Sequence, residues 1–503
     1  MVTNKSVGKR ILDGSFWTIL LNVSIRILGF VNILVLARFL EPHDMGVYAA
    51  AAVIIELITV LTQTGVGPVL IQRSNSLVSH YQTAWTINII RGTVIFCVLQ
   101  LFGQFFVTVY SSDPDVKQVI QVLAFSALLG CSSSAYFINF QKRIDFRTIA
   151  IFNIACRLAG LIATIIAAYL LRSFWALVVG NFVTTTMNLL LSHVLAPGNH
   201  RLTLSKASDL IGSSRWVMLH EICAFTSLKI DTFLITRFLG TRTLGIYDVG
   251  YQVAMMPLQE IALPVSRALF PGLASLASDR EAFRDLLTSF LAAIFYLTVP
   301  ASIGLFLIAE LLVSSLLPEE WFDTIDVIRV LVALALMRSL FSPTISALMG
   351  AGQLELNAKL SALGAILSIS FLSFGVVVYG LIGMMVAAIL VAALRSVIYL
   401  RILQKLDMFN LREYFMTIWR ALIAALFMAF CVDQFIKFGS DSLSIHQFPM
   451  LLATISVGMI SYTAVVNLLW VLAGKPGGVE SSVDKWLRDQ LKSLGKSKDS
   501  GLL

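Results

Sequence analysis

Apolar stretches of about twenty residues recur along almost the whole of this 503-residue chain, separated by short polar connections. A helix of that length rises about 30 Å, which is the thickness of the hydrocarbon core of a bilayer. Only 13% of the residues are charged, about half the share that is usual in soluble domains. The pattern excludes an ordinary soluble domain and predicts a polytopic membrane protein.

We expect about fourteen transmembrane segments. Because a backbone in lipid must satisfy its own hydrogen bonds, each segment is expected to be a helix, and the fold class is all-α. Two of the segments are separated only by Tyr379-Gly380. The expected spans are 15–37, 46–70, 84–109, 118–140, 147–171, 174–195, 213–239, 245–267, 288–312, 324–349, 357–379, 381–400, 415–437 and 449–473.

Lys and Arg are distributed unequally between alternate connections. If the N-terminus is inside, most of the basic residues outside the spans lie on the inner side. The basic residues of the outer connections are Arg38, Lys117, Arg172, Arg237, Arg242 and Lys437. Because cytoplasmic loops carry the excess of basic residues, this bias predicts that both termini are cytoplasmic. The net charge of +8 therefore reflects topology, and we expect no nucleic-acid partner.

One motif occurs twice in the chain. RFLEPHDMGVY (Arg38 to Tyr48) returns as RFLGTRTLGIY (Arg237 to Tyr247), and Ser15, Trp17 and Leu20 return at the same offset as Ser214, Trp216 and Leu219. Six expected spans fit within this offset, so the two copies have the same orientation, as in the parallel repeats of some secondary transporters. The predicted domains are two six-helix bundles, two additional spans and a basic cytoplasmic tail: 1–200, 201–404, 405–474 and 475–503.

Charged residues inside the spans are the candidate functional residues, because each costs about 2.5–3.5 kcal/mol at the centre of a span. Cations and polar neighbours are expected to line a central substrate-binding cavity: Arg26, Lys229, Arg338, Arg395, Asn22 and Asn32. Acids are expected to bind a coupling ion or to balance charge: Glu56, Glu221, Asp231 and Glu260. An internal ion-pair network would use similar residues, so that interpretation stays open.

Other charged residues lie near the ends of spans. Arg215, Arg329 and Arg420 are expected to extend their side chains to the membrane surface, and Arg420→Ala is expected to be harmless. Lys229 and Asp231 are two residues apart on a helix, so they cannot pair directly. A cavity rich in Arg and Lys attracts an anion, and the planar fork of Arg suits phosphate oxygens.

The first part of the chain resembles a known family. Residues 14–73, through ARFLEPHDMGVY (Ala37 to Tyr48) and TGVGPVLIQR (Thr64 to Arg73), resemble the polysaccharide-transporter (Wzx-like) branch of the multidrug/oligosaccharidyl-lipid/polysaccharide flippase superfamily. LFPGLASLASDREAFRDLL (Leu269 to Leu287) is similar to the family's loop after the eighth span.

The resemblance implies a fold and a function. The fold would be two six-helix bundles forming a V, as in MATE transporters. The function would be alternating-access transfer of undecaprenyl-pyrophosphate-linked oligosaccharide across the bacterial inner membrane, for exopolysaccharide or lipopolysaccharide biosynthesis. The implied partners are this lipid-linked oligosaccharide, membrane lipids, a polysaccharide polymerase and a chain-length regulator. No cofactor is implied.

Other classes of protein fit the sequence less well. An ATP-driven exporter would need GxxxxGK[ST], and the nearest segment, GTRTLG (Gly240 to Gly245), continues with Ile-Tyr. Asp113-Pro114-Asp115 resembles the DxD metal site of a membrane glycosyltransferase or polymerase, but Pro between two acids is more typical of a turn. We therefore expect no enzyme. A cation-coupled multidrug exporter remains the alternative, although such exporters usually have about twelve spans and fewer deep cations.

Overall fold

The computed structural model describes residues 4–72, 77–111, 113–143, 145–211, 215–442, 447–478 and 480–481. Across these ranges every regular element is a helix, which confirms the all-α fold class. Eight helices in these ranges are long and apolar enough to cross a bilayer, and a bent pair of shorter helices makes a ninth. The number of fourteen spans remains a prediction.

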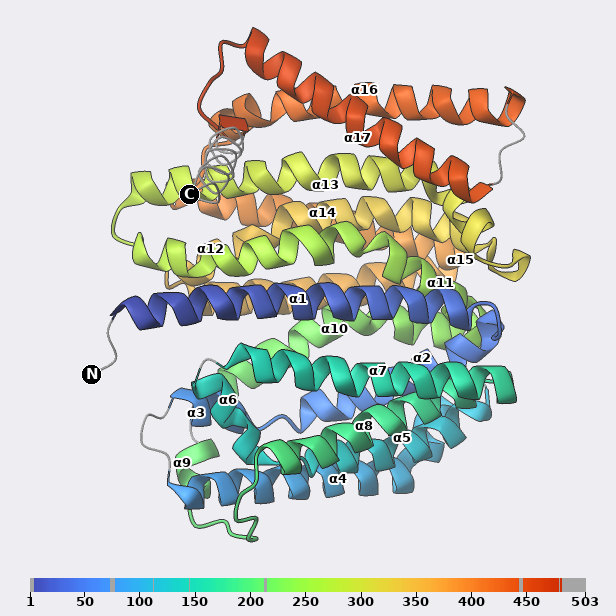
Figure 1. Cartoon of the computed structure of the whole chain (residues 1–503), viewed down its shortest axis with the longest axis vertical. Helices are drawn as coiled ribbons and strands as arrows, with labels where there is room; N and C mark the ends of the chain where they lie inside the picture. The colour runs from blue at the N-terminus through green and yellow to red at the C-terminus, as the bar shows by residue number, and fades with distance from the viewer. Residues whose placement is uncertain are drawn as a thin grey trace, which may run out of the picture. The chain divides into compact units, whose positions relative to one another are not determined.

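The chain forms two compact units. Unit 1 contains the described residues up to Val249 together with Ser368–Leu381, and unit 2 contains those of Gly250–Leu367 and from Ile382 onward. Up to residue 249 the helices are α1 (Asn4–Leu36), α2 (Pro42–Leu61), α3 (Val66–Gln72), α4 (Val78–Tyr110), α5 (Asp115–Cys131), η1 (Ala135–Phe137), α6 (Ile138–Lys142), α7 (Phe146–Leu171), α8 (Trp175–Leu195), α9 (Ala207–Ile211), α10 (Arg215–Phe238) and most of α11 (Gly240–Ala254) (Figure 1).

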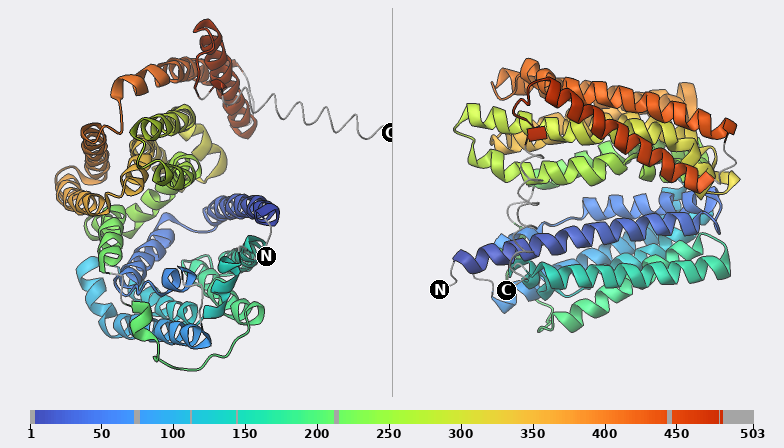
Figure 2. Two further views of the ribbon diagram at one scale, coloured as in Figure 1. Left: turned by 90° about the vertical axis from the view of Figure 1, so that its left-hand side faces the viewer. Right: turned by 45° about the horizontal axis from the view of Figure 1, so that its top comes forward.

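Unit 2 continues with longer helices. After η2, which is a π-helix (Leu258–Ala262), they are α12 (Leu263–Ser275), α13 (Arg280–Leu316), η3 (Glu319–Trp321), α14 (Thr324–Gly350), α15 (Leu354–Lys405), α16 (Leu411–Ser442) and α17 (Gln447–Leu472). The left view of Figure 2 shows many of the long helices of each unit nearly end-on. Helices within a unit therefore run in roughly the same direction, as expected for helices that cross a bilayer.

Helix α15 contains the predicted division at Tyr379-Gly380. At 52 residues it would be about 78 Å long if straight, more than twice the thickness of the hydrocarbon core. Gly380 interrupts it with φ 64° and ψ −145°, a conformation that residues with a Cβ avoid. The two predicted spans 357–379 and 381–400 are therefore separate segments that meet at this glycine.

Two other predicted spans are broken where continuous helices were predicted. The span 46–70 ends early, because α2 stops at Leu61 and α3 begins only after Gly65, whose φ is 67°. The span 118–140 bends by 58° between α5 and the short helices that follow it. The loop expected at 268–287 is also mostly helical, because α12 continues to Ser275 and the Asp279 carboxylate caps α13 by accepting the Ala282 N–H.

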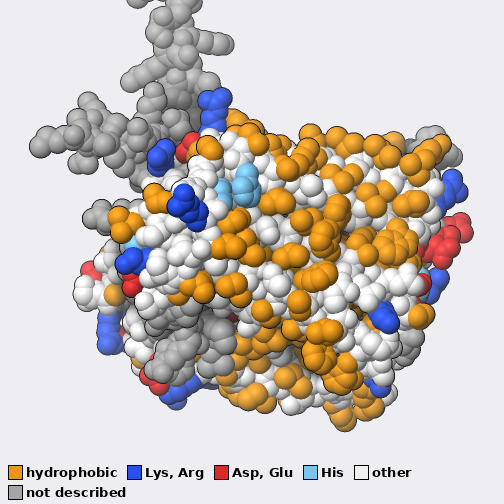
Figure 3. Space-filling view, turned by 90° about the horizontal axis from the view of Figure 1, so that it is seen from below, with side chains coloured by type: hydrophobic (Ala, Val, Ile, Leu, Met, Phe, Trp, Pro, Cys, Tyr) orange, Lys and Arg blue, Asp and Glu red, His pale blue; other side chains and the backbone are white. Residues whose placement is uncertain are grey.

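The surface fits a membrane environment. Figure 3 shows one face on which hydrophobic side chains cover the middle, while Lys, Arg, Asp and Glu lie mainly near two opposite ends. Leu101, Phe105 and Val194 are 76%, 63% and 72% exposed. Large apolar side chains at such exposure are stable in contact with lipid, whereas a water-soluble surface avoids contiguous patches of them.

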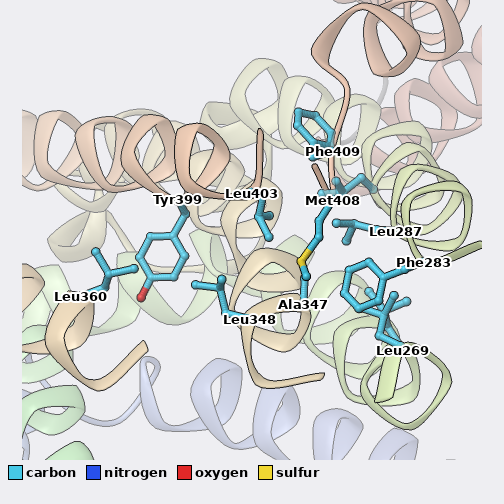
Figure 4. Packing of buried hydrophobic residues seen from close by; sticks show 12 residues of the cluster. Leu269, Phe283, Leu287, Ala347, Leu348, Leu360, Tyr399, Leu403, Met408 and Phe409 are labelled. Atoms are coloured by element: carbon cyan, nitrogen blue, oxygen red, sulfur yellow. The ribbon is translucent and has the colours of Figure 1, made fainter. Parts of the chain in front are cut away.

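One hydrophobic core cluster of unit 2 brings four helices together. Leu269 of α12, Phe283 of α13, Leu348 of α14 and Leu403 of α15 belong to one cluster of buried side chains, and each is at most 1% exposed (Figure 4). Tyr399 lies in the same cluster and points its hydroxyl group toward Leu360 in this view. The cluster fixes the half of α15 that contains the predicted site residue Arg395.

The two copies of the repeated motif contact each other within unit 1. A Cβ added to Gly46 would overlap the carbonyl oxygen of Thr241 and lie 3.0 Å from the Gly245 nitrogen. A Cβ added to Gly245 would overlap the carbonyl oxygen of Pro42 and lie 3.0 Å from the Gly46 nitrogen. The two contacts are equivalent, because Gly245 and Thr241 hold the same places in the second copy of the repeat as Gly46 and Pro42 hold in the first. The beginnings of α2 and α11 therefore cross at these two glycines, with their backbones in direct contact.

A polar cluster lies beside this glycine crossing. The Asp113 carboxylate accepts a hydrogen bond from the Thr241 hydroxyl at 2.8 Å, and His43 Nε2 lies 2.7 Å from the same oxygen. Thr241 opens α11 and His43 lies in the first turn of α2. One carboxylate therefore connects the two copies of the repeat at the point where their backbones meet.

Candidate functional site

Lys229 and Glu56 form an ion pair between two helices of unit 1. Glu56 lies on α2, and its Oε2 is 3.3 Å from Nζ of Lys229 on α10. The side chains of Lys229 and Glu56 remain 38% and 49% exposed. Because lipid-facing charges are costly, this half-exposed pair needs polar surroundings. A half-exposed pair is also weak enough for another anion to compete for the ammonium group.

Asp231 has a different environment from Lys229, although only one residue separates them. It is 4% exposed, and its carboxylate accepts hydrogen bonds from the Tyr247 hydroxyl at 2.6 Å and from the Thr232 N–H at 2.7 Å. The two-residue spacing predicts that Lys229 and Asp231 do not pair directly, and their nearest partners are indeed different. Asp231 connects α10 to α11 and is not part of the half-exposed pair.

The other predicted residues of unit 1 are dispersed. Arg26 is exposed on α1, which packs against α7, whereas α10 packs against α2. Asn32 is partly buried, and its Oδ1 has no hydrogen-bond partner among the described residues. Glu221 is partly buried, two turns before Lys229 on α10. The side chain of Asn22 lies outside the described residues, so Arg26 and Lys229 are placed on different helix pairs.

Arg338 and Arg395 are brought together in unit 2. Arg338 on α14 donates a hydrogen bond from Nη1 to the Tyr251 hydroxyl at 2.9 Å. Arg395 on α15 has its Cζ 4.9 Å from the centroid of the Phe341 ring, a cation–π contact. The two arginines are close enough for their charges to interact. The predicted cations thus form a second group that lies entirely within unit 2.

Glu260 is exposed on the π-helix η2, which follows Pro257. It lines a cavity of about 570 Å³ whose other walls come mainly from α13, α16 and α17, including Tyr296, Met428 and Tyr462. This cavity was not predicted from the sequence, because its lining residues are mostly apolar and resemble ordinary membrane-facing side chains. π-Turns occur often at functional sites, and the closely spaced prolines near η2 were the available signal.

The expectation that Arg420 reaches the membrane surface was wrong. Arg420 is only 5% exposed, and its Nε and Nη2 donate to Glu480 Oε1 and Oε2 at 2.7 and 3.2 Å. The Tyr296 hydroxyl also donates to Glu480 at 2.7 Å. Burial raises the pKa of Glu480, but the hydrogen bonds from Arg420 and Tyr296 outweigh it and hold that pKa below its usual range. The partner was missed because Glu480 lies beyond the last span, in the region expected to be a basic tail; most of that tail lies outside the described residues.

The Asp113-Pro114-Asp115 sequence forms a turn. The Asp115 N–H donates to Asp113 Oδ1 at 3.0 Å, and the other Asp113 oxygen is bonded to Thr241. In the described part of the chain, no group of three or more His, Cys, Asp or Glu side chains is placed to hold a metal ion. The Asp113 carboxylate thus binds Thr241 of α11 and the Asp115 N–H. The Asp113 and Asp115 side chains are not arranged as a metal-binding pair with a third ligand among the described residues.

Comparison with known families gives two matches. A family model described as "Polysaccharide biosynthesis protein" matches residues 35–326. A second model, "Lipid II flippase MurJ", matches residues 217–454. The first match includes both copies of the repeated motif and the four predicted charged residues on α2 and α10, which are Glu56, Glu221, Lys229 and Asp231.

Individual relatives extend over most of the chain. The "Lipopolysaccharide biosynthesis protein WzxC" of Escherichia coli (strain K12) is 25% identical over 426 residues, covering 82% of this chain and 85% of that protein. The "Succinoglycan biosynthesis transport protein ExoT" of Rhizobium meliloti (strain 1021) is 22% identical and covers 90% and 92%. A solved structure of the "Lipid II flippase MurJ, inward closed conformation" has a TM-score of 0.70 at 14% identity, covering 90% of this chain and 99% of that one.

Proposed function

The chain belongs to the polysaccharide biosynthesis protein family, and we propose that it is a flippase for lipid-linked oligosaccharides. Its substrate is an undecaprenyl-pyrophosphate-linked repeat unit, which it moves from the inner to the outer leaflet of a bacterial plasma membrane. Each hydroxyl group costs about 4–8 kcal/mol to move from water into hydrocarbon. Unassisted transfer of several sugars would therefore cost tens of kcal/mol, which a hydrated passage through the protein avoids.

The half-exposed Lys229–Glu56 pair is the observation that carries this proposal. It places a cation on a helix of membrane-spanning length without sealing it from water. A pyrophosphate brings two negatively charged groups into such a site, and it competes with the single carboxylate of Glu56 for the ammonium group. Glu56 then neutralises Lys229 when no substrate is bound, and the pyrophosphate replaces it during transport.

Alternating access supplies the rest of the mechanism. We propose that the halves 1–200 and 201–404, which are related by an axis along the membrane normal, rock against each other and present the predicted cations to each side in turn. The segment 405–474 adds two spans, and both termini together with the tail 475–503 are cytoplasmic. Arg26, Asn22 and Asn32 assist Lys229, whereas Glu221, Asp231 and Glu260 balance charge or bind a coupling ion.

The chain makes or breaks no covalent bond in this mechanism. It hands its substrate to a polysaccharide polymerase and a chain-length regulator on the outer side. The relatives named for polysaccharide biosynthesis and transport support this place in the process. A multidrug exporter would instead bind cationic substrates, and exposed Lys and Arg side chains would repel them.

A complementation experiment tests the proposed function. Deleting the gene should stop polymer export and leave a lipid-linked oligosaccharide on the inner leaflet, which mass spectrometry of the lipid extract identifies. Wild type should restore export, whereas Lys229→Ala or Arg26→Ala should not, at normal membrane abundance. Lys437→Ala is the control, because Lys437 is 65% exposed in an i,i+4 pair. Normal polymer export in the deletion strain would refute the function, and full export by both cavity variants would refute the site.

A further inference from the structure

The segment 196–206 joins α8 to α9 and contains the predicted boundary between the two halves of the chain. It lies along the end of unit 1 at which α4 begins (Figure 1). The backbone N–H of Thr203 donates to the Thr86 hydroxyl on α4 at 3.0 Å. The N–H of Lys206 donates to the Thr83 hydroxyl, one turn earlier on α4, at 3.4 Å. We call 196–206 the connecting strap, because side chains of unit 1 hold it in place.

Residues around η1 hold the first part of the connecting strap. The Ser134 hydroxyl donates to the Ala196 carbonyl oxygen at 2.9 Å, and Ser134 is buried. The Tyr136 hydroxyl donates to the Asn199 carbonyl oxygen at 3.1 Å. A Cβ added to Gly198 would overlap the Tyr136 ring, so the strap backbone lies directly against this aromatic side chain. The strap is therefore attached to both η1 and α4.

His200 lies between these attachments. Its ring centroid is 4.6 Å from that of His193 on α8 and 5.0 Å from that of Trp85 on α4. On the η1 side, the Tyr136 ring centroid is 5.3 Å away, and Nε2 of His200 is 3.1 Å from the Ser134 hydroxyl oxygen. One partly buried imidazole thus contacts α4, α8 and the start of η1 at once.

A positive charge on His200 is unfavourable in this position. Burial and the neighbouring His193 lower the pKa of His200, and its hydrogen bond with the Gly198 backbone, which raises the pKa, does not outweigh them. No carboxylate among the described residues is one of the groups that act on this charge. The ammonium group of Lys142 on α6 adds a further positive charge to this end of unit 1, where it donates to the Tyr81 hydroxyl at 3.1 Å.

His80 lies beside the far end of the strap and responds differently to protons. Its Nε2 is 3.6 Å from the Asp209 carboxylate on α9, and its Nδ1 accepts the Leu77 N–H at 3.1 Å. A neutral imidazole with its hydrogen on Nε2 makes both contacts. Protonation of His80 would strengthen the attraction to Asp209 and would not free α9. A loosening of the strap in acid is therefore assigned to His200.

We propose that the connecting strap is sensitive to protons: it is docked on unit 1 while His200 is neutral, and protonation of His200 beside His193 releases it. The connection between the two repeats is then held down at neutral pH and freed in acid. This inference goes beyond the proposed flippase function, and its test does not depend on that function.

The direction and size of the effect follow from proton binding. Above about pH 6.5, the usual pKa of histidine, His200 is neutral in both states and the docked strap has its full stability. Below that pH the released strap binds a proton more readily than the docked strap, because the pKa of His200 is lower when the strap is docked. Docking therefore weakens by up to about tenfold for each pH unit, until the pH reaches the docked pKa.

Hydrogen–deuterium exchange of the purified full-length protein in detergent micelles tests the inference. The exchange rates of the strap amides, which include Thr203 and Lys206, are compared with the intrinsic rates at the same pH to give protection factors. Between about pH 7.5 and about pH 5.5, the protection of the strap should fall by up to about tenfold for each unit below about 6.5. The protection of α7, which belongs to the same unit, should stay unchanged.

Substitutions at two strap positions separate charge from packing. His200→Phe keeps an aromatic ring that carries no charge, so strap protection should be the same at both pH values. His200→Lys carries a lasting charge, and Gly198→Val pushes the backbone off the Tyr136 ring, so each should lower protection already at about pH 7.5. His43→Gln is the matched control, since His43 lies beside Asp113 at the opposite end of α4, which is about 50 Å long. It should respond to pH as wild type does.

The outcomes that overturn the inference are distinct. If the protection of the wild-type strap changes by less than about twofold over this range, the strap does not respond to protons. If His200→Phe loses protection in acid as wild type does, another group causes the response and the assignment to His200 is wrong. If acid lowers the protection of α7 as well, the whole unit opens, and His200→Lys at about pH 7.5 decides: full strap protection in that variant contradicts the inference.

Discussion

Breaking the Arg420–Glu480 pair should be among the most destabilising single changes in unit 2. The two side chains are 6% and 4% exposed and make two charge-assisted hydrogen bonds, at 2.7 and 3.2 Å. Arg420→Ala removes both bonds and leaves Glu480 buried, with the Tyr296 hydroxyl as its remaining side-chain donor among the described residues. Removing one partner of a buried pair costs about 3–5 kcal/mol, because an uncompensated charge remains. The double variant Arg420→Met/Glu480→Gln should recover most of this loss.

The free energy of unfolding in mixed detergent micelles, titrated with dodecyl sulfate, measures the effect. The single variants Arg420→Met and Glu480→Gln form a thermodynamic cycle with the double variant, from which the coupling energy between the side chains follows. Lys437→Ala is the control, because an exposed i,i+4 pair contributes about 0.3–0.5 kcal/mol. If each single variant lowers the free energy of unfolding by less than about 1 kcal/mol, and the effects add in the double variant, the pair does not stabilise the fold as a buried ion pair.

The same pair predicts a dependence on pH. Glu480 has a pKa below its usual range, so its ionised form stabilises the folded state. This contribution is fully present above the unfolded pKa, about 4.3 for Glu, and is lost as the pH falls through the folded pKa. The stability difference between wild type and Glu480→Gln should therefore be largest near pH 7 and shrink below about pH 4. A difference that is constant over this range would contradict the ionised carboxylate.

The remaining predictions concern the crossing of the two repeats and its polar cluster. Gly46→Val should lower the free energy of unfolding by at least about 1–3 kcal/mol, since its side chain would overlap the Thr241 carbonyl oxygen. Gly103→Val should change it little, because nothing lies within 4 Å of the Cβ position there. Thr241→Val keeps the shape but removes the hydroxyl that donates to Asp113, so it should cost about 1–3 kcal/mol. Both are measured by the same detergent titration, and a neutral Gly46→Val would contradict the backbone contact.

Local sequence determined the parts of the fold that could be predicted. The length of the apolar stretches predicted membrane-spanning helices, and Gly380 marked the division within α15 because only glycine readily takes its φ of 64°. The break before α3 was not predicted, although Gly65 also has a positive φ, because apolar residues on both sides hid the change of direction. Hydropathy records how many apolar residues are present and does not record where the chain bends.

Long-range pairing explains what the sequence did not reveal about the site. Lys229 and Glu56 were both singled out as charged residues within spans, but their pairing depends on how α2 and α10 pack. Arg395 was also singled out, whereas its close packing against Gly364 is visible only when the two halves of α15 are placed side by side. Arg420 was misassigned because its position near the end of a span is compatible with either exposure or a distant partner.

Transfer of a lipid-linked oligosaccharide between leaflets is the most direct test of the central claim. Purified protein is reconstituted into liposomes that contain an undecaprenyl-diphosphate-linked oligosaccharide in both leaflets, and a membrane-impermeant glycosidase is added outside. We predict that wild type exposes the inner-leaflet fraction to the enzyme, whereas Lys229→Ala leaves it protected as in protein-free liposomes. Protection of that fraction with wild-type protein, at confirmed incorporation and intact vesicles, would contradict the flippase mechanism.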